Sequence, residues 1–443
     1  MFRLKFLRVL FMATSTMLLT VHGYSQNVVD SLSMTLEECL EFAKSNSITL
    51  KQAQLTIEDM IADELSASGV FLPTVSAAVG QGVSVTPLIT SGSSGNYYGS
   101  YGVDLSMPIY SGGKNRASLE QSKLNSEMAE LSLAEQENSL EVAVTEVFVQ
   151  MLYMMEQIDV AKNSLELSKK NLERGKDFLE LGSISKADYA QLVSAKADSE
   201  YDVIVAQTTL SNLQVTLKQL LEISQDVYIC AVPPLLSDDV IMAPLYSVSE
   251  VYNSALEIRP EITQSYLTIA SAELDEKIAK AGYLPTISLT AGTGVSHSSS
   301  SSYTFSDQMR NNFTTSVGAS VSVPIFSNYK NKTAKIKAQN AINSASLSLT
   351  DAEKTLYLTI ETLHNNASNA QAQFSAADAK LEAAKVSLEL LTEQYYQNMK
   401  NIVELLTEQD NYLESSQSYL TNKYQFILNR ALLEYYKTDL IKL

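Results

Sequence analysis

Four short stretches of the chain alternate large apolar side chains with glycine, serine and other small residues. A period of two residues is typical of β-strands with one apolar face and one small polar face. A whole face of glycine and serine suits strands that border a wide polar lumen, although a half-buried hairpin of a soluble protein gives a similar pattern. The predicted strands are 72–86, 97–110, 285–297 and 313–326.

Longer segments follow a helical period, with apolar side chains recurring at positions i, i+3, i+4 and i+7. The chain has no proline or glycine between Gly113 and Gly175, which predicts one helix of roughly 100 Å over 113–181. Thr35 and Glu38 have the spacing of a capping box and predict the start of an earlier helix over 34–68. The other predicted helices are a return helix over 186–221, a helix before the third strand, a long helix over 329–397 and a return helix over 402–437.

The two halves of the chain carry the same landmarks in the same order. Leu-Pro-Thr occurs at 72–74 and at 284–286, and Pro-Ile followed by an aromatic residue occurs at 108–110 and at 324–326. The offsets between the copies are 212 and then 216 positions. Such long-range self-similarity indicates an internal duplication. We therefore expect a first repeat over 26–222, a linker over 223–247 and a second repeat over 248–443.

The first 25 residues have the features of a secretory signal peptide. Arg3, Lys5 and Arg8 precede a short apolar segment, and the small residues Gly23 and Ser25 precede Gln26. A retained membrane anchor is the alternative, but the apolar segment is short for a membrane span. No later stretch approaches 18 apolar residues, so we expect a periplasmic, secreted or outer-membrane β-protein.

The charge and the reactive residues exclude several classes of function. The formal net charge of −18 at pH 7 argues against a nucleic-acid partner and favours a lumen that attracts cations. His297 and His364 are the histidines beyond the signal, and no third ligand or catalytic partner has a matching spacing. We therefore expect no enzyme, no catalytic residue, no metal site and no cofactor. Cys39 and Cys230 either form a disulfide or stay as two free thiols.

Four strands cannot close a barrel, and an open strand edge is not tolerated in lipid. Three copies would supply twelve strands, which is an even number in the usual range for outer-membrane barrels. The fold class expected is therefore an α+β membrane protein: a trimeric twelve-stranded outer-membrane β-barrel, with four strands from each protomer, continuous with a long α-helical periplasmic tunnel. Aromatic residues at the helix-proximal strand ends are candidates for a membrane girdle in contact with outer-membrane lipid: Phe71, Tyr110, Tyr283 and Phe326.

These features together resemble the TolC-like outer-membrane efflux protein family, the outer-membrane factors of tripartite efflux and type I secretion systems. The motifs that carry the resemblance are Met-Thr-Leu-Glu-Glu-Cys-Leu at 34–40, aromatic-Leu-Pro before the first strand of each copy, Pro-Ile-aromatic at the end of the second strand, and Gly-Ser-Ile-Ser-Lys-Ala-Asp-Tyr at 182–189. The resemblance covers nearly the whole chain after the signal. It implies a homotrimeric exit duct in the outer membrane of a Gram-negative cell, with an equatorial belt to which 223–246 contributes.

The resemblance also implies a gate at the periplasmic tips of the helices. Matched position by position, Asp188 takes the place of an acidic latch residue, and Tyr395 and Lys400 take the places of its aromatic and basic partners. Glu404 falls where members of the family often carry an acid that faces the constriction. Thr407 departs from members with a second acid one turn later.

The same resemblance implies partners at the tip turns. A periplasmic adaptor, or membrane fusion protein, is expected to dock there and to connect the duct to an inner-membrane transporter. An exposed apolar patch of Ile184 and Met399 would suit a helical hairpin of the adaptor. The expected contact residues are Gly182, Ser183, Ile184, Asn398, Met399 and Lys400.

Two questions stay open at the level of the sequence. A non-channel periplasmic helical scaffold protein with soluble hairpins is the alternative function. Within the channel class, small toxic molecules, exported proteins and metal cations are all possible cargo, because helices of this composition border a passage that suits each of them.

Overall fold

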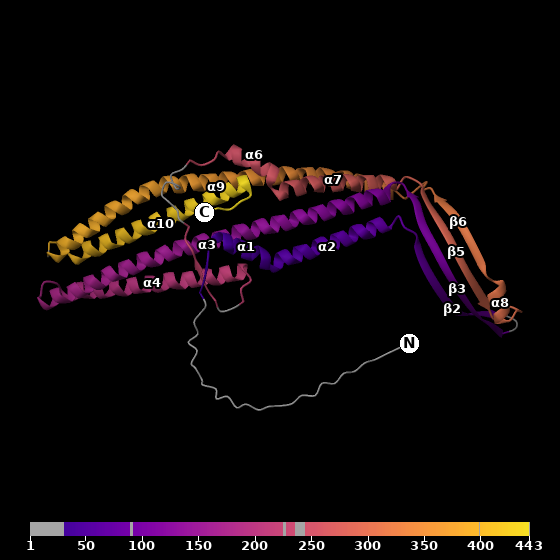
Figure 1. Ribbon diagram of the computed structural model, residues 1–443, viewed down its shortest axis with the longest axis horizontal. Helices are drawn as coiled ribbons and strands as arrows, with labels where there is room; N and C mark the ends of the chain where they lie inside the picture. Colours follow the sequence, from indigo (N-terminus) through magenta and orange to yellow (C-terminus); the bar gives the residue numbers. More distant parts are fainter. Residues whose placement is uncertain (1–30, 89–91, 225–226, 235–243, 398, 443) are drawn as a thin grey trace, which may run out of the picture.

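The computed structural model describes residues 31–88, 92–224, 227–234, 244–397 and 399–442. The protomer is elongated, with a curved β-sheet at one end and two long helical hairpins reaching the other end (Figure 1). The signal peptide predicted at 1–25 lies outside the described residues. Among the residues described, no helix combines the length and apolar character needed to cross a membrane.

One antiparallel sheet contains β2 (Thr74–Leu88), β3 (Gly92–Ser111), β5 (Thr286–Ser298) and β6 (Thr314–Ser322), in that order. β6 ends at Ser322, whereas the sequence predicts a strand as far as 326. In β5, Thr286 is the first residue and lies opposite Ser322, so the residues that follow β6 have no strand beside them. Pro324 also lacks an N–H group to donate.

The strand register confirms the two faces that the alternation predicts. Val79 lies beside Tyr101, and Tyr101 lies beside Val295, on the face that carries most of the large apolar side chains. Their neighbours along each strand, such as Gly80 and Ser100, lie opposite one another on the other face. One side of the sheet is therefore apolar and the other is small and polar.

The connections between the strands are rich in serine and glycine, yet they contain more regular structure than the predicted strand bounds leave them. β3 already begins at Gly92, so 92–96 belong to the hairpin. The connection between β5 and β6 contains a short helix, α8 (Phe305–Asn311), which the serine-rich sequence does not predict. Gln308 holds α8 to the end of β5, because its side chain accepts a hydrogen bond from Ser298 N (2.8 Å) and donates one to Ser298 O (3.1 Å).

Two helical hairpins make up most of the length of the protomer. The first pairs α3 (Lys114–Glu180) with α4 (Lys186–Leu220), and the second pairs α9 (Lys330–Tyr396) with α10 (Ile402–Thr438). α3 and α9 have 67 residues each, and both begin after a turn with a left-handed backbone, at Gly112 and Gly113 in one copy and at Asn328 and Tyr329 in the other. This correspondence at an offset of 216 confirms the internal repeat.

The helix before each strand pair is broken, which the sequence prediction of one helix over 34–68 missed. The first copy has α1 (Leu36–Asn46) and α2 (Ile48–Gly69), and the second has α6 (Val248–Ile258) and α7 (Pro260–Ala281). The predicted capping box of Thr35 and Glu38 is confirmed at the start of α1. The breaks occur because Ser47 accepts a hydrogen bond from Leu50 N and caps a new helix, and because a proline disfavours helical backbone in the residue before it.

The linker and the N-terminal segment meet in a small parallel sheet that the sequence does not predict. β1 (Ser31–Met34) pairs with β4 (Tyr228–Ala231), and residues from both strands join the apolar cluster around Phe148 and Leu217. Both cysteines are free thiols, so the disulfide alternative is not realised. Burial raises the pKa of the Cys39 thiol to about 12, with a smaller contribution from the charge of Glu38, and makes the thiol inert.

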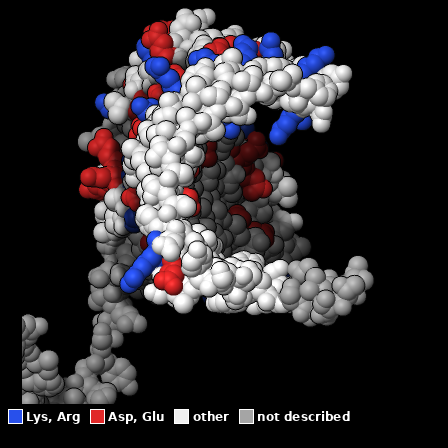
Figure 2. Space-filling model, turned by 90° about the vertical axis from the view of Figure 1, so that its right-hand side faces the viewer, with Lys and Arg blue, Asp and Glu red and all other residues white. Residues whose placement is uncertain are grey.

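Sheet and helices form one continuous curved wall. Packed side by side, α2, α3, α7 and α9 follow one another in that order, just as β2, β3, β5 and β6 do. One edge of the wall is therefore β2 with α2, and the other edge is β6 with α9. Figure 2 looks onto the sheet end and shows the wall as an arc around a hollow, with acidic side chains visible inside the hollow.

Candidate functional site at the helical tips

The two hairpins turn at the end of the molecule farthest from the sheet (Figure 1). In the first turn, Gly182 has a φ of +72° and ends α3, a conformation that favours glycine. In the second, Asn401 caps α10 by accepting a hydrogen bond from Glu404 N at 2.9 Å. The end of α3 and the start of α10 therefore follow from local sequence.

Asp188 and Tyr395 are close enough to interact within one protomer. Asp188 caps α4 together with Ser185, whose backbone and side-chain hydrogen bonds lower the pKa of the carboxyl group. Tyr395 is buried, and its ring packs edge-on against Phe178 with centroids 5.8 Å apart. Burial, and then the negative charge of Asp188, raise the pKa of Tyr395. The Tyr395 hydroxyl is buried and has no hydrogen-bond partner among the described residues.

Lys400 and Glu404 form an ion pair with each other. Their Nζ and Oε2 atoms are 3.0 Å apart on the first turn of α10, and both side chains are partly exposed. Within the described protomer this is the ion pair that Lys400 makes, and it does not reach Asp188. A surface pair of this kind contributes about 0–1 kcal/mol, so either residue can exchange partners at little cost.

The residues predicted to contact an adaptor differ in their exposure to solvent. Gly182, Ser183 and Met399 are exposed, with Met399 at 71%. Ile184 is not exposed as expected, because it packs into the apolar cluster formed by Phe178, Leu192 and their neighbours. Leu181, which the sequence analysis passed over, is 77% exposed at the same turn. Asn398 lies outside the described residues.

A buried polar network, which no sequence pattern indicates, joins the two hairpins close to the tip. Gln409 of α10 donates a hydrogen bond to Ser168 Oγ of α3 at 2.8 Å, and its carbonyl oxygen lies 3.4 Å from Asn171 Nδ2. Asn171 accepts a hydrogen bond from the Tyr396 hydroxyl of α9 at 3.1 Å. Ser168 also bonds Ser199 of α4 at 2.9 Å. The network therefore ties all four helices together away from solvent.

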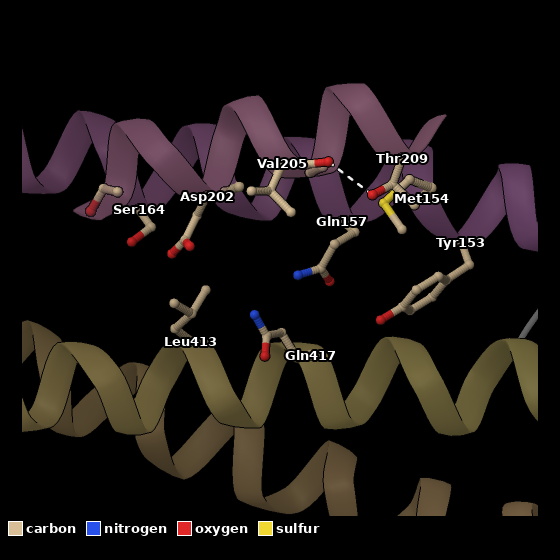
Figure 3. A pocket seen from close by; sticks show the side chains of 12 residues that line it. Tyr153, Met154, Gln157, Ser164, Asp202, Val205, Thr209, Leu413 and Gln417 are labelled. Carbon is tan, nitrogen blue, oxygen red and sulfur yellow. Dashed lines mark hydrogen bonds between the residues drawn. The ribbon is translucent and has the colours of Figure 1, made fainter. Parts of the chain in front are cut away.

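A cavity of about 260 Å³ with a mixed polar and apolar lining lies next to this network, between α3, α4 and α10. In Figure 3, Gln157 points into it from α3 and Gln417 points into it from α10, with Asp202 at one end. Polar side chains on facing helices leave room between the hairpins, unlike the close apolar contacts above and below. The apolar core between the hairpins is thus interrupted here, next to the hydrogen bond by which Gln409 joins α10 to α3.

Three aspartates face one another across the groove beside α4 and α10. Asp198 and Asp202 lie on α4, and Asp410 lies on α10. Burial, followed by the charges of Asp198 and Asp202, raises the pKa of Asp410. The ionised form of Asp410 therefore opposes the packing of the two hairpins.

This repulsion predicts a pH-dependent effect of the Asp410→Asn variant. A carboxyl group whose pKa is raised on folding binds more protons in the folded state, so its contribution to stability falls as the pH rises through that pKa. Asp410→Asn is expected to melt above the wild type at neutral pH, and the gain should shrink at acidic pH, as Asp410 takes up its proton. Thermal unfolding at both pH values measures this, with the exposed Asp378→Asn as control. A gain that is equal at both pH values would contradict the prediction.

The four candidate girdle residues lie at the junction of the sheet and the helices. All of them are exposed on the isolated protomer: Phe71, Tyr110, Tyr283 and Phe326. The opposite end of the sheet carries a second set of exposed aromatic residues, which the sequence analysis did not single out: Tyr97, Tyr98, Tyr303, Phe305 and Phe313. These residues could have been found from the sequence by their positions at the far ends of the predicted strands and in the connecting loop.

Comparisons with known proteins agree with this architecture. The family model described as "Outer membrane efflux protein" matches residues 40–221 and 251–435, one range in each repeat. Outer membrane protein TolC of Escherichia coli is 25% identical over 253 residues, which are 53% of this chain and 49% of that protein. The chain spans about half the length of the curated relatives it matches.

Solved structures show the same fold at low sequence identity. A membrane protein from Pseudomonas aeruginosa superimposes with a TM-score of 0.78 at 17% identity, covering 91% of this chain and 89% of that one. The CmeC outer membrane channel of Campylobacter jejuni gives a TM-score of 0.74 at 18% identity, with coverage of 91% and 86%. The predicted fold class of sheet, long helices and internal repeat is confirmed.

Proposed function

The chain belongs to the outer membrane efflux protein family, and from this premise we propose that it is the passive exit duct of an efflux or secretion machine. The protein is an outer-membrane protein whose helices extend into the periplasm. Its family is one of efflux proteins and not of enzymes, which agrees with the expectation of no catalytic site. Cargo is driven through the duct by a transporter elsewhere in the machine.

The observation that carries this proposal is the open wall with two matching edges. The sheet ends in β2 on one side and β6 on the other, and each edge continues into a helix that is the edge of the helical layer, α2 and α9. Unpaired strand edges in lipid require closure. If β2 of each copy pairs with β6 of the next, three copies form a closed barrel of twelve strands. Contacts between α2 and α9 of neighbouring copies then close the helices into a tunnel. Outer-membrane lipid then surrounds the apolar face of the sheet.

The tips of the hairpins act as the gate of the duct. We assign a latch to Asp188, Tyr395 and Lys400, and a ring of Glu404 carboxylates to the constriction. The unpartnered Tyr395 hydroxyl near Asp188 and the easily exchanged Lys400–Glu404 pair support this assignment. In the trimer, Lys400 exchanges Glu404 for an acid of the neighbouring protomer.

The exposed tip turns receive the periplasmic adaptor, which links the duct to an inner-membrane transporter. The contact residues are those of the two turns, Gly182, Ser183, Asn398, Met399 and Lys400, with Ile184 behind them. The exposure of Met399 and Leu181 supports an apolar contact at this end. Small toxic molecules, exported proteins and metal cations remain alternative cargo.

Single-channel conductance of the detergent-extracted protein in a planar bilayer tests the duct and its latch together. The wild type should insert with a small, cation-selective conductance, because the tips are closed and the protein carries a net negative charge. The variant Asp188→Ala plus Lys400→Ala should conduct more, because the tips lose the latch. Lys169→Ala, an exposed lysine elsewhere on α3, serves as control.

The outcomes separate the proposals. Failure of well-folded wild-type protein to insert would favour the periplasmic scaffold and remove the basis for the gate. Insertion with equal conductance in wild type and double variant would retain the duct and reject the latch.

A further inference from the structure

The two edges of the helical wall carry opposite charges. On α2 an acidic edge consists of Glu58, Asp59 and Asp63. On α9 a lysine edge occupies the first eight residues, which contain no acid: Lys330, Lys332, Lys335 and Lys337. In Figure 2, blue side chains, with some red ones among them, lie along the upper part of the arc, the side on which Figure 1 places β6 and α9.

These charges are exposed and have no ionic partner in the described part of the protomer. All three acids and all four lysines lie on the solvent-accessible surface. None of them takes part in the ion pairs formed within the described protomer, although other lysines such as Lys280 pair with an acid one turn away. Four neighbouring lysines without an acid repel one another. The lysine edge therefore lacks its counter-charge within the described part of its own protomer.

Apolar residues accompany the charges on both edges. On α2, Leu55, Ile61 and Leu65 are each more than half exposed, and on α9 the same holds for Ile336 and Leu347. Exposed apolar side chains at helical spacing indicate a face that another helix covers. Each edge is thus an apolar stripe with charges beside it, acidic on α2 and basic on α9.

The charged segments lie at the same distance from the sheet. Asp63 is six residues before Gly69, the last residue of α2, and Lys335 is five residues after Lys330, the first residue of α9. At 1.5 Å per residue they lie about 9 Å and about 8 Å from helix ends that adjoin the sheet. Farther along, the signs reverse, with Lys51 on α2 and Asp351 on α9. The two edges are complementary over several turns.

We propose that the partner of the lysine edge is the acidic edge of a second copy of this chain, so that charge selects the α2-to-α9 contact of the ring. The proposal rests on the proposed channel function, because that function requires closure of the wall. A two-fold contact between identical edges would place lysines against lysines or acids against acids. The charge pattern therefore disfavours dimers in which identical edges lie parallel, and it favours a closed head-to-tail ring.

Charge reversal with rescue tests this proposal on the full-length, detergent-extracted protein, with the mass of the particle measured by native mass spectrometry. Lys335→Glu plus Lys337→Glu converts attraction to repulsion at every interface of the ring. At fixed protein concentration the trimer population should fall by about tenfold or more. Asp59→Lys plus Asp63→Lys should have the same effect, and the variant that combines all four changes should recover the trimer.

A matched control carries the same charge change away from the edges. Lys114→Glu plus Lys123→Glu alters exposed lysines of α3, which has helices of its own protomer on both sides, and it should stay trimeric. Trimers that survive both edge reversals, or a combined variant no better than either reversal, would overturn the proposal while leaving the duct intact. A wild type that is folded but monomeric would overturn the proposed function as well.

Discussion

Replacing Arg259 by alanine is expected to lower the free energy of unfolding by about 3 kcal/mol. Arg259 is 5% exposed at the break between α6 and α7. Its guanidinium group bonds the Glu261 and Asp439 carboxylates, each at 3.3 Å. It also lies 4.7 and 4.5 Å from the ring centroids of Tyr435 and Tyr436. One side chain thus fixes a helix break to the end of α10.

The charge of Arg259 persists despite its burial. Burial opposes the cation, but Glu261 and the two tyrosines raise the pKa of Arg259 above its ordinary value. Removal leaves two carboxylates without their counter-charge and a gap between aromatic rings. Arg259→Lys should recover only part of the loss, because an ammonium group is a compact point charge without the rigid planar donor fork and the flat stacking face of a guanidinium group.

Thermal unfolding followed by circular dichroism measures the effect at fixed protein and detergent concentrations. Arg116→Ala, an exposed arginine on α3, should unfold like the wild type. An Arg259→Ala protein that melts within about one degree of the wild type would show that the contacts of Arg259 add nothing measurable.

The architecture of the wall follows from the sequence because it depends on periodicity. Period-two alternation gives the strands, and the uninterrupted helical period gives α3 and α9. The offset of 216 between Pro108 and Pro324 carries through to the left-handed turns at Gly112 and Asn328. Each of these features is determined within a few residues along the chain, so a single sequence is sufficient.

The departures from prediction have tertiary causes. The helix break at Ser47 occurs inside an apolar, helix-forming stretch, where a buried capping hydroxyl competes with helix continuation. β6 stops where its neighbour β5 begins, and nothing in its own alternation marks that point. Ile184 is sheltered by Phe178 and Leu192, which approach it only because the hairpin folds back.

The site at the tip could be predicted only in part for the same reason. Gly182 and the cap of α4 are visible as local motifs, and family resemblance supplies Asp188 and Lys400. The partners Asn171 and Gln409 are 238 residues apart, and each looks like an ordinary polar residue of a solvated helix. Only the packing of α10 against α3 shows that both are buried.

Replacing Gln409 by alanine is expected to widen the resting duct. Gln409 is 5% exposed, and Asn171 is fully buried. The variant leaves the Asn171 and Ser168 side chains short of a partner, which costs about 1–3 kcal/mol. The cost destabilises the packed arrangement of the two hairpins. When the hairpins separate, the Asn171 and Ser168 side chains can form hydrogen bonds with water instead. The equilibrium therefore shifts toward separated hairpins, and single-channel conductance should rise.

Asn429→Ala is the matched control on the same helix, since the Asn429 amide group donates to Gln425 O of its own helix within the described protomer. It should conduct like the wild type. A double-mutant cycle then distinguishes a shared link from two independent losses of packing. If Asn171 and Gln409 act through one link, Asn171→Ala plus Gln409→Ala conducts no more than the stronger single variant. Additive increases would mean that each side chain holds its own helix and that the contact between the hairpins does not restrain the tip.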